Sequence, residues 1–302
     1  MPTGDLTRHR ASILRMGVQR VVLTGGEPLM HSDLDAFCGF FRDLNVHLTL
    51  LTTGLLLLKR AASVASLFND VIVSLDGPAH IHDRIRRVNG AFALIQKGIA
   101  AVRGANPRIK ITCRTTVQNA NHLHLRETIA AAHALGMDSI SFLAADVSSA
   151  AFNREEGWPP ERQREITLTA GQLTALREEI ELLIVEYRDD IQSGYILENP
   201  AKLRRIPERF NEYLQTEIEP RAPLCNAPWV SAVVDVDGSV RPCFFHPPIG
   251  SLNAGTLENV LQGATAQNFR NSLDVASNPV CRRCVCSLNY HSAPIADPDQ
   301  AT

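Results

Sequence analysis

The sequence lacks an excess of either charge, a long hydrophobic run and an N-terminal export signal. Its 30 Lys and Arg residues nearly balance 32 Asp and Glu residues, so the net charge of −2 gives no reason to expect nucleic acid or an anionic membrane as a partner. The leucine run 55–58 is far too short to span a bilayer. Residues 1–5 show no basic-then-apolar signal pattern. We therefore expect a cytoplasmic protein.

Cysteine is scarce until late in the chain. Of the seven cysteines, only Cys38 and Cys113 precede residue 225, each inside an apolar segment where a small buried hydrophobic residue is the ordinary interpretation. The other five crowd together near the end: Cys225, Cys243, Cys281, Cys284 and Cys286. In a reducing cytosol such clustering indicates metal or redox chemistry rather than structural disulfides.

Residues 10 to about 145 alternate between strand-like and helix-like periodicity. The expected strands are almost continuously apolar, which is typical of a parallel sheet covered by helices. Their expected ranges are 20–24, 47–51, 70–75, 109–117 and 139–143. Periodicity alone fits both a doubly wound sheet and a partial barrel, and it does not separate them.

Each expected strand ends in a polar or glycine-rich tip, and parallel strands collect such tips on one face, where ligands bind. The most distinctive tip is Gly25-Gly26-Glu27-Pro28. Paired glycines let a ligand approach the backbone closely, and Pro28 fixes the direction in which the chain leaves. From these residues alone, an ordinary turn with a solvated Glu27 is the alternative.

The clustered cysteines have the spacing of a metal site. Cys225 precedes an expected hairpin over 230–242, which turns at an Asp-Gly pair, and Cys243 follows it. Cys281 and Cys284 lie in a tight knuckle that lets both thiolates face one metal. Four thiolates suit either a tetrahedral zinc ion or an iron–sulfur cluster, and both remain open.

Taken together, these motifs resemble those of radical S-adenosylmethionine (SAM) enzymes with a C-terminal SPASM or twitch domain. Residues 23–29, Leu-Thr-Gly-Gly-Glu-Pro-Leu, resemble the GGEP element of that family. Residues 74–86 resemble its SLDGP…HD..R stretch, with His82, Asp83 and Arg86 in the matching positions. The spacings Cys225-x12-Gly238-x4-Cys243 and Cys281-x2-Cys284 match parts of the SPASM signature.

The resemblance implies an α/β fold with two main parts. The first is a partial (β/α)6 TIM-like barrel of the radical SAM type that lacks its first strand, and the second is a small Cys-rich domain with a β-hairpin and a knuckle. The implied boundaries are 1–146 for the barrel, truncated at its N-terminus, 147–222 for a helical linker or extension, 223–292 for the SPASM/twitch Fe–S domain and 293–302 for a disordered tail.

The resemblance also implies a SAM site at the strand tips. The family's GGEP element binds the methionine end of SAM, a role that falls here to Gly25, Gly26, Glu27 and Pro28. Ser74 would contact the ribose or the carboxylate, and Arg114 is a candidate for the carboxylate because its forked guanidinium pairs with such groups. A structural ion pair is the alternative for Arg114.

For the C-terminal cysteines, the resemblance implies an auxiliary [4Fe–4S] cluster. Its ligands would be Cys225, Cys243, Cys281 and Cys284, with Cys286 surplus or an alternative ligand. A second [4Fe–4S] cluster, which cleaves SAM, is expected in the family, but its Cys-x3-Cys-x2-Cys motif is absent here because no cysteine precedes Cys38. Either the sequence is truncated or it belongs to a descendant without that cluster.

The family to which the sequence is similar consists of oxidoreductases and maturases. They use a 5′-deoxyadenosyl radical to modify a peptide or small-molecule substrate, with a reducing partner such as flavodoxin or ferredoxin. As written, the chain is expected to be inactive because it lacks the SAM-cluster cysteines. Two alternatives remain: a non-catalytic relative that binds only the auxiliary cluster, and a zinc-ribbon α/β protein of another function.

Overall fold

The computed structural model describes residues 6–149, 151, 154, 157–214 and 222–290. The tail expected over 293–302 lies outside the described residues. The chain divides into two compact units, Met1–Glu219 and Pro220–Thr302. Among the described residues, no helix is both long and apolar enough to cross a membrane.

The first unit is built on a five-stranded parallel sheet with strand order β1-β2-β3-β4-β5. The strands are β1 (Arg20–Leu23), β2 (His47–Thr52), β3 (Asp70–Ser74), β4 (Lys110–Val117) and β5 (Ile140–Ala144). Every strand pairs with the next one along the chain, whereas a doubly wound sheet reverses its order at a switch point. The order therefore favours the partial barrel, which periodicity alone could not do.

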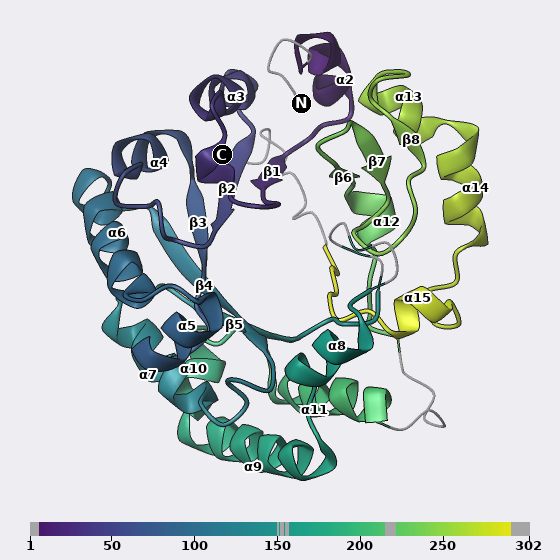
Figure 1. The fold of residues 1–302 in the computed structure, drawn as a ribbon. Helices are drawn as coiled ribbons and strands as arrows, with labels where there is room; N and C mark the ends of the chain where they lie inside the picture. The colour runs from purple at the N-terminus through teal and green to yellow at the C-terminus, as the bar shows by residue number, and fades with distance from the viewer. Residues whose placement is uncertain (1–5, 150, 152–153, 155–156, 215–221, 291–302) are drawn as a thin grey trace, which may run out of the picture. The chain divides into compact units, whose positions relative to one another are not determined.

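Helices cover one face of this sheet, as Figure 1 shows for α3, α4, α6 and α7. The helical elements are η1 (Thr7–His9), α2 (Arg10–Arg15), η2 (Pro28–Met30), α3 (Leu34–Arg42), α4 (Ala61–Leu67), α5 (Ala79–Arg86), α6 (Ala91–Ala105) and α7 (Leu125–Ala134). The short helix α5 is absent from the sequence-based expectation because its charged residues dilute the apolar pattern. It carries the His82, Asp83 and Arg86 positions.

The two faces of the sheet differ in burial. Along β4, Ile111, Cys113 and Val117 are buried, while Arg114 between them is exposed. Cys113 and Cys38 are at most 1% exposed, and burial raises the pKa of Cys38 to about 12. Both cysteines are therefore core residues, as the sequence predicts.

Four more helices belong to the first unit: α8 (Pro160–Ile166), α9 (Ala170–Glu186), α10 (Arg188–Ser193) and α11 (Pro200–Leu214). Helix α9 begins at a capping box in which Thr169 and Gln172 exchange hydrogen bonds. It contacts α7 and α11, and α11 contacts β5. The segment expected as a linker or extension therefore packs on the sheet.

The second unit contains a small antiparallel sheet of β6 (Val233–Val234), β7 (Ser239–Arg241) and β8 (Gly250–Ser251). Gly238 forms the β6–β7 turn with a φ of +86°, a conformation that favours glycine. The hairpin is shorter than expected because residues up to 230 form a helical turn. The helices are α12 (Ala227–Val230), α13 (Leu257–Gln262), α14 (Ala264–Ser272) and α15 (Pro279–Arg282).

Candidate functional site

Glu27 ties the tip of β1 to the tip of β2. Its carboxylate accepts hydrogen bonds from the Thr52 hydroxyl at 2.8 Å, from the Thr53 backbone N–H at 2.9 Å and from the Leu29 N–H at 3.2 Å. The Thr53 hydroxyl is a fourth donor. A carboxylate with this many donors is fully engaged, so Glu27 is not a solvated turn residue. Its carboxylate is occupied in holding the loop in place, so it is the backbone of the loop that is free to contact a ligand.

The two glycines of this loop face open space. A Cβ atom built on Gly25 or Gly26 would meet nothing within 4 Å, and Gly25 has a φ of +89°. By contrast, a Cβ on Gly54, at the neighbouring tip, would lie 2.8 Å from Cγ1 of Ile95. Gly54 is thus required by packing, whereas Gly25 and Gly26 leave room for a ligand beside the backbone.

The tip of β3 is held by a buried ionic network centred on Asp76, which is 3% exposed. Arg86 donates two hydrogen bonds to its carboxylate, at 2.6 and 3.2 Å. Nδ1 of His82 lies 3.3 Å from the same carboxylate, and Asn121 donates to the Asp76 carbonyl at 2.9 Å. Burial acts to raise the pKa of Asp76, but His82 and Arg86 hold it below the usual value.

Asp83 completes this tip from α5. Its carboxylate accepts the backbone N–H groups of Gly90 at 2.7 Å and Phe92 at 2.8 Å, at the start of α6. The charged residues of the stretch 74–86 therefore bind one another and the backbone. They hold the β3 tip in place beside Ser74, at which the strand ends.

A row of polar side chains crosses the face of the sheet that lacks these helices. Strand register aligns Ser74 with Arg114 and Arg114 with Ser141. The guanidinium of Arg114 donates to the Ser141 hydroxyl at 3.3 Å, and within the described part of the chain it has no ion-pair partner within 4 Å. Beyond 4 Å it interacts electrostatically with Glu198, whose pKa it acts to lower.

Glu198 lies beside this row and is 3% exposed. It accepts the Phe142 N–H at 2.9 Å and lies 3.6 Å from Nζ of Lys202. Burial raises the pKa of Glu198, although Phe142, Lys202 and Arg114 all act to lower it. The sequence alone offers no signal for Glu198, because the region 146–222 that contains it has no pattern that indicates a ligand.

In the second unit, the thiols of Cys225, Cys243, Cys281 and Cys284, which come from three segments, affect one another's pKa. Burial raises the pKa of Cys281 to about 11, with further contributions from Cys243 and Cys225. Burial also raises the pKa of Cys284, to which Cys286, Cys243 and Cys225 contribute. Closely spaced thiols resist joint ionisation in this way unless a cation neutralises them. All five cysteines of this unit are free of disulfides.

Cys286 lies beside Cys284. It contributes to the raised pKa of Cys284, and its carbonyl accepts a hydrogen bond from the Cys284 thiol at 2.8 Å.

Among the residues that the structure describes, no group of three or more His, Cys, Asp or Glu side chains is placed to hold one metal ion. Four cysteine thiolates are the usual ligands of a [4Fe–4S] cluster, so the chemistry of this donor set suits such a cluster.

Asn226 and His246 make contacts near the cysteines that the sequence does not reveal. The Asn226 side chain donates to the Tyr290 carbonyl at 2.6 Å and accepts its N–H at 2.9 Å, which brings Cys225 near Tyr290, the last described residue. His246 is 4% exposed, with Nε2 3.3 Å from Sγ of Cys281. Neither contact has a sequence signal, because each joins residues more than 30 positions apart.

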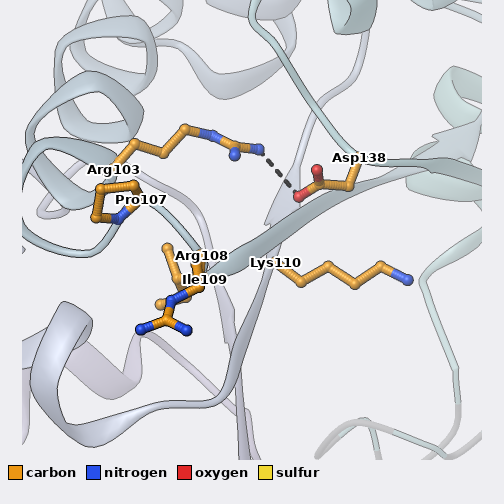
Figure 2. A pocket seen from close by; sticks show the side chains of 6 residues that line it. All are labelled: Arg103, Pro107, Arg108, Ile109, Lys110 and Asp138. Atoms are coloured by element: carbon orange, nitrogen blue, oxygen red, sulfur yellow. Dashed lines mark hydrogen bonds and ion pairs between the residues drawn. The ribbon is translucent and has the colours of Figure 1, made fainter.

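A hollow of about 320 Å³ lies at the opposite end of the strands, near the start of β4. Figure 2 shows that Arg103 points to Asp138, with which it forms an ion pair at 2.9 Å, while Arg108 and Lys110 point elsewhere. The cationic groups do not converge, and parallel strands bind ligands at their carboxyl ends. This hollow is therefore not the candidate site.

Fold and site together define an α/β protein with polar and glycine-rich tips on its parallel strands and a second unit that holds five cysteines. The sequence matches the profile of the radical SAM superfamily over residues 2–132 and that of SPASM, an iron–sulfur cluster-binding domain, over residues 225–285. The chain belongs to the radical SAM superfamily and carries a SPASM domain. The cofactors that these two domains imply are SAM and [4Fe–4S] clusters.

Three curated relatives show the range of activities near this sequence. The chain is similar to an AdoMet-dependent heme synthase of Methanosarcina barkeri, with 31% identity over 55% of this chain and 52% of the relative. It is 32% identical to a pre-heme d1 synthase of Dinoroseobacter shibae over 51% of this chain and 39% of the relative. A GTP 3′,8-cyclase of Rhizobium etli is 27% identical over 68% of this chain and 55% of the relative. The chain spans about half or less of the length of these relatives.

Solved structures share the fold at lower identity. The structure of native anSMEcpe with bound AdoMet has a TM-score of 0.61 at 17% identity, covering 94% of this chain and 81% of that one. The structure of Streptococcus suis SuiB bound to precursor peptide SuiA has a TM-score of 0.62 at 14% identity, covering 95% of this chain and 65% of that one. These matches confirm the expected partial barrel with a small Cys-rich C-terminal domain.

Proposed function

We propose that this chain is the SAM-binding and auxiliary-cluster part of a radical SAM oxidoreductase or maturase. The set Cys225, Cys243, Cys281 and Cys284 carries the proposal, because these four thiols form no disulfide and lie in the part of the chain that matches the SPASM iron–sulfur profile. These four residues would hold an auxiliary [4Fe–4S] cluster. When bound, the cluster supplies a one-electron site in this unit.

The SAM site would use the strand tips of the first unit. The open backbone of Gly25 and Gly26, held by Glu27 and Pro28, would meet the methionine end of SAM. Ser74 and Arg114 would bind its ribose or carboxylate, supported by their alignment in register. What these residues do is bind and orient SAM.

Binding of SAM to the full chain should weaken at least about tenfold in Arg114→Met, because a hydrogen bond to a charged group contributes about 1.5–3 kcal/mol. Equilibrium dialysis with labelled SAM measures the affinity. Arg108→Met is the matched control, since it removes the same charge at the far end of the strands. Equal losses in the two variants would contradict the assignment of Arg114.

The 302-residue chain by itself is proposed to bind SAM without cleaving it. Its first unit contains only Cys38 and Cys113, both buried in the core, so no thiolates there are available for a SAM-cleaving cluster. The same dialysis samples, treated with dithionite, should release no 5′-deoxyadenosine. Release of that product would overturn this part of the proposal.

A tetrapyrrole is the substrate class that we propose, supported by the two heme-related relatives at 31% and 32% identity. A propionate-bearing porphyrin titrated into the full chain should show a saturable shift of its main absorbance band. GTP should not compete with the porphyrin. Competition by GTP, or porphyrin binding that does not saturate, would contradict this substrate class and favour a cyclase-like or peptide substrate.

A further inference from the structure

His246 is buried against one of the four clustered cysteines. Its Nε2 atom lies 3.3 Å from Sγ of Cys281, and only 4% of the residue is exposed. The Phe269 ring packs edge-on against the imidazole, with centroids 4.9 Å apart. A side chain so enclosed has little freedom to turn its Nε2 atom away from the sulfur.

The backbone around His246 is anchored as well. Arg241 donates to the His246 carbonyl at 3.3 Å, and the same guanidinium pairs with Asp235 at 2.6 Å. The backbone N–H of His246 also contributes to the environment of Cys243 by a hydrogen bond to its thiol. His246 therefore lies between Cys243 and Cys281, two of the proposed cluster ligands, and Arg241 in the β6–β7 hairpin anchors its backbone.

The chemistry of the contact determines the direction of the hydrogen bond. A cysteine that binds iron is a thiolate and carries no proton, so its sulfur is only an acceptor. The imidazole nitrogen 3.3 Å away must then carry the proton and donate it. Hydrogen bonds to ligand sulfurs stabilise the more negative, reduced state of an iron–sulfur cluster and so raise its reduction potential.

We propose that His246 donates an Nε2–H···S hydrogen bond to Cys281 and raises the reduction potential of the auxiliary cluster. The proposal rests on the four-cysteine site proposed above. His246 is a positioning residue that acts through Cys281. With a [4Fe–4S] cluster held by these cysteines, His246 would affect the potential at which the cluster takes one electron from an external reductant such as dithionite, with no proton transferred.

The test is a redox titration of the full chain, reconstituted anaerobically with iron and sulfide, reduced with dithionite and followed by EPR. His246→Leu should bind as much iron as the wild type but hold the electron about tenfold more weakly, which lowers the midpoint potential by about 59 mV. His246→Gln, which keeps an N–H donor, should recover most of that shift. Phe269→Leu, which changes the packing on His246 without removing a donor, should leave the potential unchanged.

Each contrary result has a distinct meaning. An unchanged potential in His246→Leu, or an equal shift in Phe269→Leu, would overturn the hydrogen-bond role. Loss of iron from His246→Leu would overturn it too, because His246 would then be a ligand. A wild type that binds no iron–sulfur cluster would refute the four-cysteine site itself, which separates failure of the proposed function from failure of this inference.

Discussion

Cys281→Ala should abolish iron retention by the reconstituted chain, from about four irons per chain to none, since a [4Fe–4S] cluster held by four thiolates loses one of its anchors. The pKa of Cys281 responds to both Cys243 and Cys225, and its Sγ lies 3.3 Å from Nε2 of the buried His246. Iron and sulfide analysis after desalting, with the brown absorbance of the cluster, measures the effect.

Cys286→Ala is the matched control for this experiment. It removes a thiol five residues away and keeps the Cys286 backbone carbonyl that accepts the Cys284 thiol, so it should retain the full iron content. Full retention in Cys281→Ala would refute its assignment as a ligand. Loss in Cys286→Ala would make Cys286 a ligand, and a colourless, zinc-loaded wild type would replace the cluster with a zinc ribbon.

Asp76→Asn should destabilise the first unit by about 3 kcal/mol, because removing one partner of a buried ion pair leaves the other uncompensated. Asp76 is 3% exposed, and the side chain of its partner Arg86 is 25% exposed. The loss of the carboxylate also frees the β3 tip beside Ser74. Urea unfolding at neutral pH, compared with wild type, measures the change in the free energy of unfolding.

The effect should depend on pH with a definite sign. The pKa of Asp76 is lower in the folded chain than its ordinary value of about 3.9, so its stabilising contribution is complete above that pH. The contribution is lost as the pH falls through the folded-state pKa. The difference between wild type and Asp76→Asn should therefore shrink below about pH 4.

Glu181→Gln provides the control for Asp76→Asn. Glu181 pairs with Arg204 at 2.6 Å, but both side chains are about half exposed, where ion pairs contribute little. This variant should unfold nearly as the wild type does at every pH. A destabilisation by Glu181→Gln as large as that by Asp76→Asn would show that burial is not what makes the Asp76 network important.

The sequence by itself determined the parallel strands and their tips. Apolar periodicity is local, so the expected strand over 109–117 matches β4 (Lys110–Val117) to within one residue. The glycine pair before Glu27 and the cysteine spacings are likewise readable from neighbours along the chain. Apolar periodicity did not predict helix α5, because its residues bind Asp76 and the start of α6 rather than forming an apolar stripe.

Only the tertiary structure decided which distant groups meet. Glu27 reaches Thr52 and Thr53, 25 and 26 residues on, and His246 reaches Cys281 after 35 residues. Such contacts depend on how whole elements pack, since closing a loop of that length has an entropic cost that no local pattern records. The sequence could therefore predict the glycine-rich loop and the cysteine site. Only the packing showed that Glu27 joins two strand tips by hydrogen bonds and that His246 faces the sulfur of Cys281.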